Sequence, residues 1–167
     1  DSGGTALRIK ENGGYVDAGT EDDVTFLPNT ISGLDLAEGE YATVHAGTVA
    51  NDTNVDWDGR LVIYSGGIAS GVAVQSNGEL VVSSGGTALQ IRENGGYVSA
   101  YYGAEITFLP NTFTEVIGRA ATVHAGTVAS SATVDSHGKL EIFSGGIAMH
   151  TTVRSRDRKS GSAGMAR

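Results

Sequence analysis

The chain places two of its histidines in an identical setting, because the sequence ATVHAGTVA occurs at 42–50 and again at 121–129. An imidazole titrates near neutral pH, so a histidine can transfer protons or bind a metal. A duplicated catalytic centre would give each histidine an acidic or serine partner at the same spacing in both copies. We find no such partner for His45 or His124. We therefore interpret both as turn-facing members of a structural repeat.

A second candidate site lies at Asp56, Trp57 and Asp58, with Arg60 two residues further on. The second copy has Ser136 in place of Trp57, so this group of charged and aromatic residues is not repeated. An aromatic ring between carboxylates suits contact with a sugar, and the same ring could instead cover a loop. Both interpretations of this segment stay open.

Other features of the sequence argue against phosphate-binding, metal-binding and catalytic sites. The glycine-rich sequence ENGG at 11–14 and 93–96 lacks the following Lys-Ser/Thr of a phosphate loop, so we interpret it as a structural turn. The asparagines of these turns and of the LPNT sequences are expected to bond backbone; they are Asn12, Asn29, Asn94 and Asn111. The absence of cysteine excludes disulfides and thiolate metal sites. We expect no catalytic residue, no cofactor and no metal.

Charge limits the partners of the chain. The formal net charge is −8, and residues 154–167 hold five of the 11 Lys and Arg residues and one acid, so the rest of the chain is more acidic still. An acidic body repels nucleic acid and anionic lipid. No apolar run approaches the roughly 20 residues that span a bilayer. We expect neither nucleic-acid binding nor membrane insertion of this segment.

Two nested repeats organise the sequence. GGTALRIKENGGYV at 3–16 returns as GGTALQIRENGGYV at 85–98, and the loop at 31–41 returns at 113–120 with three residues fewer. The long repeats span 3–84 and 85–153. Within them Gly47, Gly66 and Gly85 lie 19 residues apart, as do Gly126 and Gly145. Such a short period is typical of stacked structural units.

Each short unit alternates β-branched and polar residues between glycine pairs, which predicts strands and turns. Repeated without a crossover helix, these units predict an all-β, right-handed parallel β-helix of about eight coils with 19–22-residue repeats. We expect two strands and two turns per coil, with the glycine pairs aligned in columns. Val72, Val74, Leu80 and Val82 should point inward. Residues 154–167 have lost the apolar face, and we interpret them as a degraded or capping terminal coil.

The sequence SGGIASGVAVQSNGELVVSSGGTAL resembles the strand-loop-strand repeat of bacterial autotransporter passengers, a family that includes the adhesin involved in diffuse adherence. The pattern matches at 47–66, 66–85 and 126–145, and less closely at 145–164. The resemblance implies a non-catalytic passenger segment on the surface of a Gram-negative cell, anchored to the outer membrane in the full-length protein. It implies adhesion, autoaggregation or biofilm formation, through host-cell or bacterial receptors or through self-association.

The same resemblance implies that a heptosyltransferase of the native host glycosylates the segment. Candidate attachment sites are the serines directly before glycine pairs, Ser65, Ser84 and Ser144.

Two other functions remain as alternatives. Parallel β-helices often carry polysaccharide lyases or glycoside hydrolases, and a hydrolase needs two carboxyl groups about 5–10 Å apart. The acidic residues here fall mostly in non-equivalent turns, so no catalytic set is evident. An ice-binding solenoid needs threonines in register on one face, whereas Thr43, Thr48 and Thr53 have no counterparts in the next coil.

Overall fold

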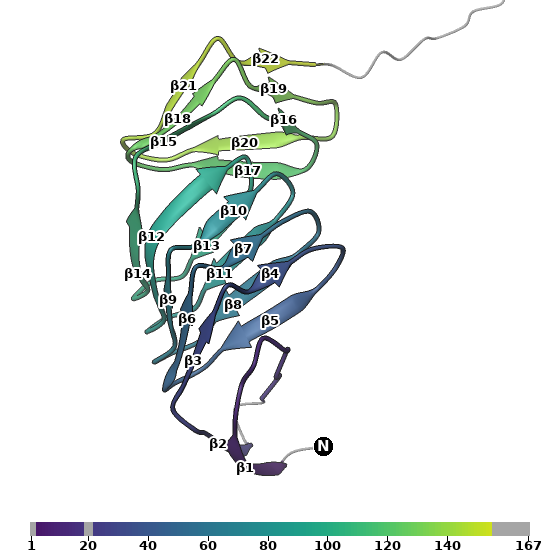
Figure 1. Cartoon of the computed structure of the whole chain (residues 1–167). Coiled ribbons are helices and arrows are strands. Elements are labelled where there is room, and N and C mark those ends of the chain that lie inside the picture. Colours follow the sequence, from purple (N-terminus) through teal and green to yellow (C-terminus); the bar gives the residue numbers. More distant parts are fainter. Residues whose placement is uncertain (1–2, 19–21, 155–167) are drawn as a thin grey trace, which may run out of the picture.

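The computed structural model describes residues 3–18 and 22–154, which form a β-solenoid of about eight coils (Figure 1). Within these ranges the chain contains strands and turns and no helix, hence no helix long and apolar enough to cross a membrane. The named strands of this part of the chain pair in parallel. Leu61 lies beside Leu80 and Ile63 beside Val82, so successive coils stack in the register that the glycine spacing predicts. The predicted β-solenoid is confirmed.

Each complete coil has three sides, which we call faces A, B and C. Face A contains β1 (Thr5–Ile9), β2 (Asp23–Phe26), β3 (Asn29–Ser32), β6 (Thr48–Asn51), β9 (Ile68–Ser70), β12 (Thr87–Asn94), β14 (Glu105–Phe108), β15 (Asn111–Phe113), β18 (Thr127–Ser130) and β21 (Ile147–Met149). Face B contains β4 (Asp35–Leu36), β7 (Asn54–Val55), β10 (Ala73–Gln75), β16 (Val116–Ile117), β19 (Thr133–Val134) and β22 (Thr152–Val153). Face C contains β5 (Tyr41–Val44), β8 (Arg60–Ile63), β11 (Glu79–Val82), β13 (Tyr97–Ala100), β17 (Ala120–Val123) and β20 (Lys139–Ile142). The second half of β12 also serves face B, where it pairs with β10.

The expectation of two strands per coil is therefore wrong. The third strand is the short one on face B, which has only two or three residues in most coils. Only two residues, such as Gly71 and Val72, separate it from the face A strand before it, so alternation alone does not distinguish the two strands. The parallel pairing of Val55 with Val74 nevertheless makes it part of a continuous sheet.

Alternation along the strands builds the core. The four aliphatic residues expected to point inward, Val72, Val74, Leu80 and Val82, are fully buried, so that prediction is confirmed. They belong to a cluster contributed by all three faces. Because each coil buries its side chains against the coils on either side, the core is continuous along a stack.

The glycine pairs at 66–67, 85–86 and 145–146 align in a column at the corner between faces C and A, as predicted. The first glycine of these pairs is left-handed, with φ of 75° at both Gly66 and Gly85, and the single Gly47 at the same corner has φ of 88°; this region costs other residues free energy. The second glycine fits for a different reason. A Cβ added at Gly67 would lie 2.2 Å from the carbonyl oxygen of Val44 in the previous coil. The first position requires glycine because of its positive φ, and the second requires glycine because a side chain would clash with the previous coil.

The solenoid is divided into two stacks with separate cores. The first stack, residues 29–108, has the larger cluster, and the second stack, residues 111–153, has its own cluster around Phe113, Ile117 and Val123. Figure 1 shows β15 to β22 offset from the strands below them. β1 and β2 pair with the same register and the same irregularity as β12 and β14, their equivalents in the second long repeat. Each long repeat therefore begins at an equivalent junction.

The expected terminal coil at 154–167 falls almost wholly outside the described residues, which end at Arg154.

Candidate functional site

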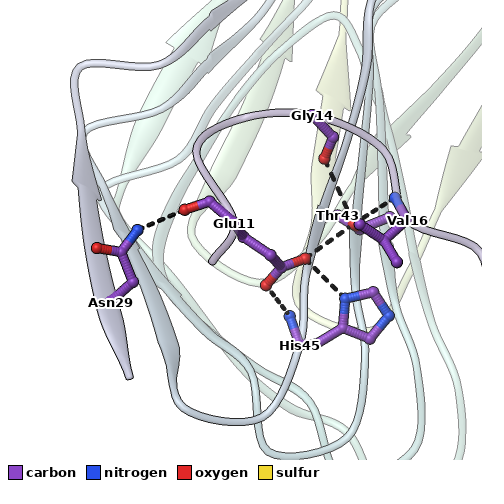
Figure 2. A network of polar contacts seen from close by, with 6 residues as sticks. All are labelled: Glu11, Gly14, Val16, Asn29, Thr43 and His45. Atoms are coloured by element: carbon purple, nitrogen blue, oxygen red, sulfur yellow. Dashed lines mark hydrogen bonds and ion pairs between the residues drawn. The ribbon is translucent and has the colours of Figure 1, made fainter. Parts of the chain in front are cut away.

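The repeated histidine lies at the junction that begins the first stack, where it meets a buried glutamate (Figure 2). Glu11 is 3% exposed. One of its oxygens, Oε2, accepts the backbone N–H of His45 at 2.8 Å. The other, Oε1, lies 2.7 Å from Nδ1 of His45 and accepts the hydroxyl of Thr43 at 2.9 Å. A single carboxylate thus holds one ring, one hydroxyl and one amide.

The second junction reproduces this network atom for atom. Glu93 is fully buried. It accepts the hydroxyl of Thr122 at 2.6 Å and the backbone N–H of His124 at 2.9 Å, and Oε1 lies 2.7 Å from Nδ1 of His124. The same partners, in the same roles, serve both long repeats.

Each histidine ring is also stacked between two aromatic rings. His45 lies between Phe26 and Tyr64, with ring centroids 4.1 and 4.5 Å away and ring planes within 11° of parallel. His124 lies in the same way between Phe108 and Phe143, at 4.4 and 4.2 Å. The flanking rings come from face A and from the next coil of face C, so the histidine is clamped from both sides along the solenoid axis.

At each junction the glutamate carboxylate supplies the hydrogen-bond acceptor that a neighbouring strand would otherwise provide. β5 and β17 are the first face C strands of their stacks, and each pairs with a strand on one side only. On the other side Thr43 N–H reaches Gly14 O at 3.1 Å, and Val16 N–H reaches the Thr43 hydroxyl at 3.0 Å (Figure 2). The amide of His45 has no strand carbonyl there and is satisfied by Glu11 instead. Buried backbone N–H groups require such partners.

Electrostatics favour the charged form of the carboxylate at the first junction. Burial alone would raise the pKa of Glu11. The hydrogen bonds from the side chain and backbone of His45, with smaller contributions from Thr48 and Thr43, outweigh burial and hold the pKa of Glu11 below its ordinary value of 4.5. A carboxylate that accepts several hydrogen bonds in its charged form is stabilised in that form.

The statement that neither histidine has a recurring acidic partner is therefore wrong. The partners are Glu11 and Glu93, which were assigned to the ENGG turn. A constant sequence spacing does not identify these pairs, because Glu11 precedes His45 by 34 residues and Glu93 precedes His124 by 31. The three-residue deletion in the intervening loop accounts for the difference. Pairing the two exactly repeated sequences, ENGG with ATVH, would have found them.

Two of the four asparagines near these turns bond backbone as predicted, whereas Asn94 accepts the side-chain amide of Asn111 at 2.5 Å. The side-chain amide of Asn29 donates to the carbonyl of Glu11, and that of Asn111 donates to the carbonyl of Glu93 at 2.8 Å. These bonds tie the segment that carries each glutamate to β3 or β15 on face A.

The second candidate, Asp56, Trp57 and Asp58, lies at the turn between β7 and β8. The Asp56 carboxylate accepts the backbone N–H of Trp57 at 2.7 Å, and the Asp56 carbonyl accepts the N–H of Gly59 at 2.8 Å, which closes the turn. The indole of Trp57 is 58% exposed, so it leaves the loop largely uncovered. Asp58 has φ of 60° and forms an ion pair with Arg119, from the start of the second stack. Contact of these residues with a ligand stays a prediction.

The candidate glycan attachment sites share one corner of the solenoid. Ser65, Ser84 and Ser144 are all exposed, each at the turn between faces C and A. The hydroxyl of Ser65 lies against Gly85 of the next coil, where an added Cβ would come within 2.6 Å of it. Modification of these serines stays a prediction. Within residues 3–18 and 22–154, no group of three or more His, Asp or Glu side chains is arranged to hold a metal ion.

Comparisons with known proteins find similarity among solved structures. The sequence matches no known protein-family profile and no curated protein at a significant level. Among solved structures, the chain is similar to a fragment of TibA that is hyper-glycosylated by TibC, with 24% identity and a TM-score of 0.44. The match covers 90% of this chain and 59% of the TibA fragment, so the chain spans less than two thirds of that structure.

Proposed function

We propose that this chain is a non-catalytic segment of a bacterial cell-surface adhesin, in which the solenoid is a scaffold for adhesive contacts. Its ligands are receptors on host cells or other bacteria, or further copies of itself. The family resemblance of the repeats suggests this role.

The proposal that the chain is non-catalytic is supported by the way in which the two Glu–His pairs are bonded and enclosed. A Glu–His pair could activate a water molecule or a nucleophile. Here each carboxylate binds a backbone amide as well as the ring, and each ring is enclosed between two aromatic rings. The pair recurs at both junctions in the described chain, where each stack begins. A group that recurs with the architecture supports a structural role.

Adhesion can be tested with beads coated with the purified chain. We expect the beads to bind epithelial cells or to clump with each other, in contrast to beads coated with the Val74→Asp variant, whose core is disrupted. Coated beads that neither bind cells nor clump, with the chain folded by circular dichroism, would contradict the adhesive role.

Glycosylation can be tested separately by co-expression with a heptosyltransferase that modifies autotransporter passengers. We expect a mass increase that falls when Ser65, Ser84 and Ser144 are all changed to alanine. An unchanged mass, or an increase that the triple variant keeps in full, would show that these serines are not the acceptors.

A further inference from the structure

Most tyrosines of the chain gather on the outward side of face C in the first stack, although they are scattered in the sequence. Tyr41 and Tyr97 begin β5 and β13, and Tyr64 and Tyr101 directly follow β8 and β13. The ring of Tyr15 contacts that of Tyr41 with centroids 6.5 Å apart. The structure therefore assembles an aromatic surface that no local sequence pattern indicates.

Between these rings lies a hollow with an apolar floor. Val62 and Val81 are paired neighbours on β8 and β11 and point away from the core, yet they are only 7% and 6% exposed. The hollow has a volume of about 350 Å³ and is lined by Arg60, Val62, Tyr64, Val81, Ser83, Ser84 and Tyr101. Two aromatic walls, an apolar floor and a polar rim form a site for a ligand with both apolar and polar faces.

The hollow continues into two others, and together we call them the face C groove. The second has a volume of about 210 Å³ and shares Arg60 with the first. The third, of about 280 Å³, shares Asn77, Glu79 and Arg119 with the second. Each is at or below the low end of roughly 300–1,000 Å³ that compact small-molecule sites occupy. A row of small hollows suits an extended ligand built of small repeating units.

The positive and negative charges of the residues that line the groove are equal in number. Arg60 forms an ion pair with Glu79, with Nε and Oε2 at 3.1 Å, and Arg119 forms one with Asp58. These four side chains remain 40–60% exposed, so their outer atoms can still form hydrogen bonds. Burial, followed by Tyr15 and Asp17, raises the pKa of Tyr64 and keeps its hydroxyl neutral. The groove offers paired donors and acceptors without net charge.

Two further observations limit the chemical class of the ligand. The strands β8 and β11 under the groove pair on both sides, and the open side of β5 is covered by Gly14 and Val16. An extended peptide would therefore find no free strand edge and would lack the backbone pairing that strand addition uses. Two of these tyrosines are also unrepeated, because Tyr41 corresponds to Ala120 in the second long repeat and Tyr101 corresponds to Gly19 in the first. Tyr97 in contrast repeats Tyr15, and Tyr64 corresponds to Phe143, which flanks the second histidine in the same way. Because the repeat does not require Tyr41 or Tyr101, these two residues favour recognition over architecture.

We propose that the face C groove binds a neutral oligosaccharide. The C–H faces of its sugar rings stack on Tyr64 and Tyr101, and its hydroxyls bond to the ion-paired Arg60, Glu79, Arg119 and Asp58. This inference rests on the proposed adhesive function, because it names the chemical class that the adhesive segment recognises. It assigns the sugar contact expected near Asp56, Trp57 and Asp58 to the neighbouring groove, to which Asp58 belongs.

The test uses the chain produced without a heptosyltransferase, so that Ser84 at the rim is unmodified. The labelled chain is applied to an array of neutral, sialylated and sulfated glycans, and the best neutral oligosaccharide is then titrated by calorimetry. We expect retention on neutral glycans. Tyr101→Ala should weaken binding about tenfold or more, since stacked aromatic contacts contribute on this scale. The adjacent Tyr102 is fully exposed and does not line the groove, so Tyr102→Ala is the matched control and should leave the affinity unchanged.

Retention of no neutral glycan, or stronger retention of sulfated or sialylated glycans, would overturn the proposal. Equal losses in the two tyrosine variants would also overturn it, because binding would then lie outside the groove. A folded chain that fails here yet still coats adhesive beads would refute the saccharide groove alone. A chain that binds glycans but supports no bead adhesion would instead refute the proposed function.

Discussion

Removal of the carboxylate of Glu93 should separate the stability of the two stacks. Glu93→Ala leaves the hydroxyl of Thr122, the amide of His124 and its ring without their common acceptor. Taking one partner from a buried, hydrogen-bonded charge typically costs about 3–5 kcal/mol. The loss of the desolvation penalty of Glu93 offsets part of this, so we expect a value toward the lower end. Glu93→Gln keeps the shape and should cost less.

The location of the loss can be measured as well as its size. Trp57, the only tryptophan, belongs to the first stack, so its fluorescence follows residues 29–108, whereas far-UV circular dichroism follows all strands. In urea we expect the two signals to coincide for the wild type. In Glu93→Ala, circular dichroism should lose amplitude before the fluorescence changes, because the second stack has lost its attachment. In a stacked solenoid, stability depends on interfaces between neighbours.

The matched control is Glu105→Ala, which removes an exposed carboxylate from β14 in the same region. Surface substitutions of this kind usually change stability by no more than about 0.5 kcal/mol. The reasoning fails if Glu93→Ala behaves like this control and its two unfolding curves coincide.

Three other predictions concern the scaffold. Val74→Asp places a carboxylate in the fully buried centre of the first stack and should cost several kcal/mol, and an unchanged melting temperature would contradict its inward position. Gly67→Ala should lower stability by about 1–3 kcal/mol through overpacking against Val44, whereas Gly14→Ala, with open space around its Cβ, should have little effect; equal melting temperatures would disprove the close-approach argument. Because the pKa of Glu11 is lowered by folding, its contribution is complete above its ordinary value of 4.5 and is lost as the pH falls through the folded pKa. The stability gap between wild type and Glu11→Gln, measured in urea, should therefore be constant above that pH and narrow below it, and a gap that widens on acidification would show the opposite shift.

The sequence predicts the parts of this fold that repeat at a constant spacing. The evenly spaced glycines identify the coil, and alternation identifies Val74 and Leu80 as core residues. The face B strand is not distinguished from the face A strand before it, because only two residues, such as Asp52 and Thr53, separate the two. Its existence follows only from pairing with the coils above and below.

The polar junction and the groove are harder to predict, for different physical reasons. Glu11 and Glu93 are brought to their histidines by a chain path whose length differs between the copies, so spacing conceals the contact. The tyrosines of the groove come from strands in different coils, and only the stacking places them on one surface. Asp58, in contrast, was identified as a possible ligand contact from its neighbours in the sequence and does line the groove.

The proposal that this chain presents an adhesive surface and performs neither hydrolysis nor elimination is tested by measuring reaction products. The purified chain is incubated with a panel of acidic and neutral polysaccharides, and reducing and unsaturated ends are quantified over time. We expect no release of reducing or unsaturated ends above a buffer control. Release by the chain that is abolished by Asp56→Asn or Asp58→Asn would contradict it and identify the solenoid as a polysaccharide-cleaving enzyme.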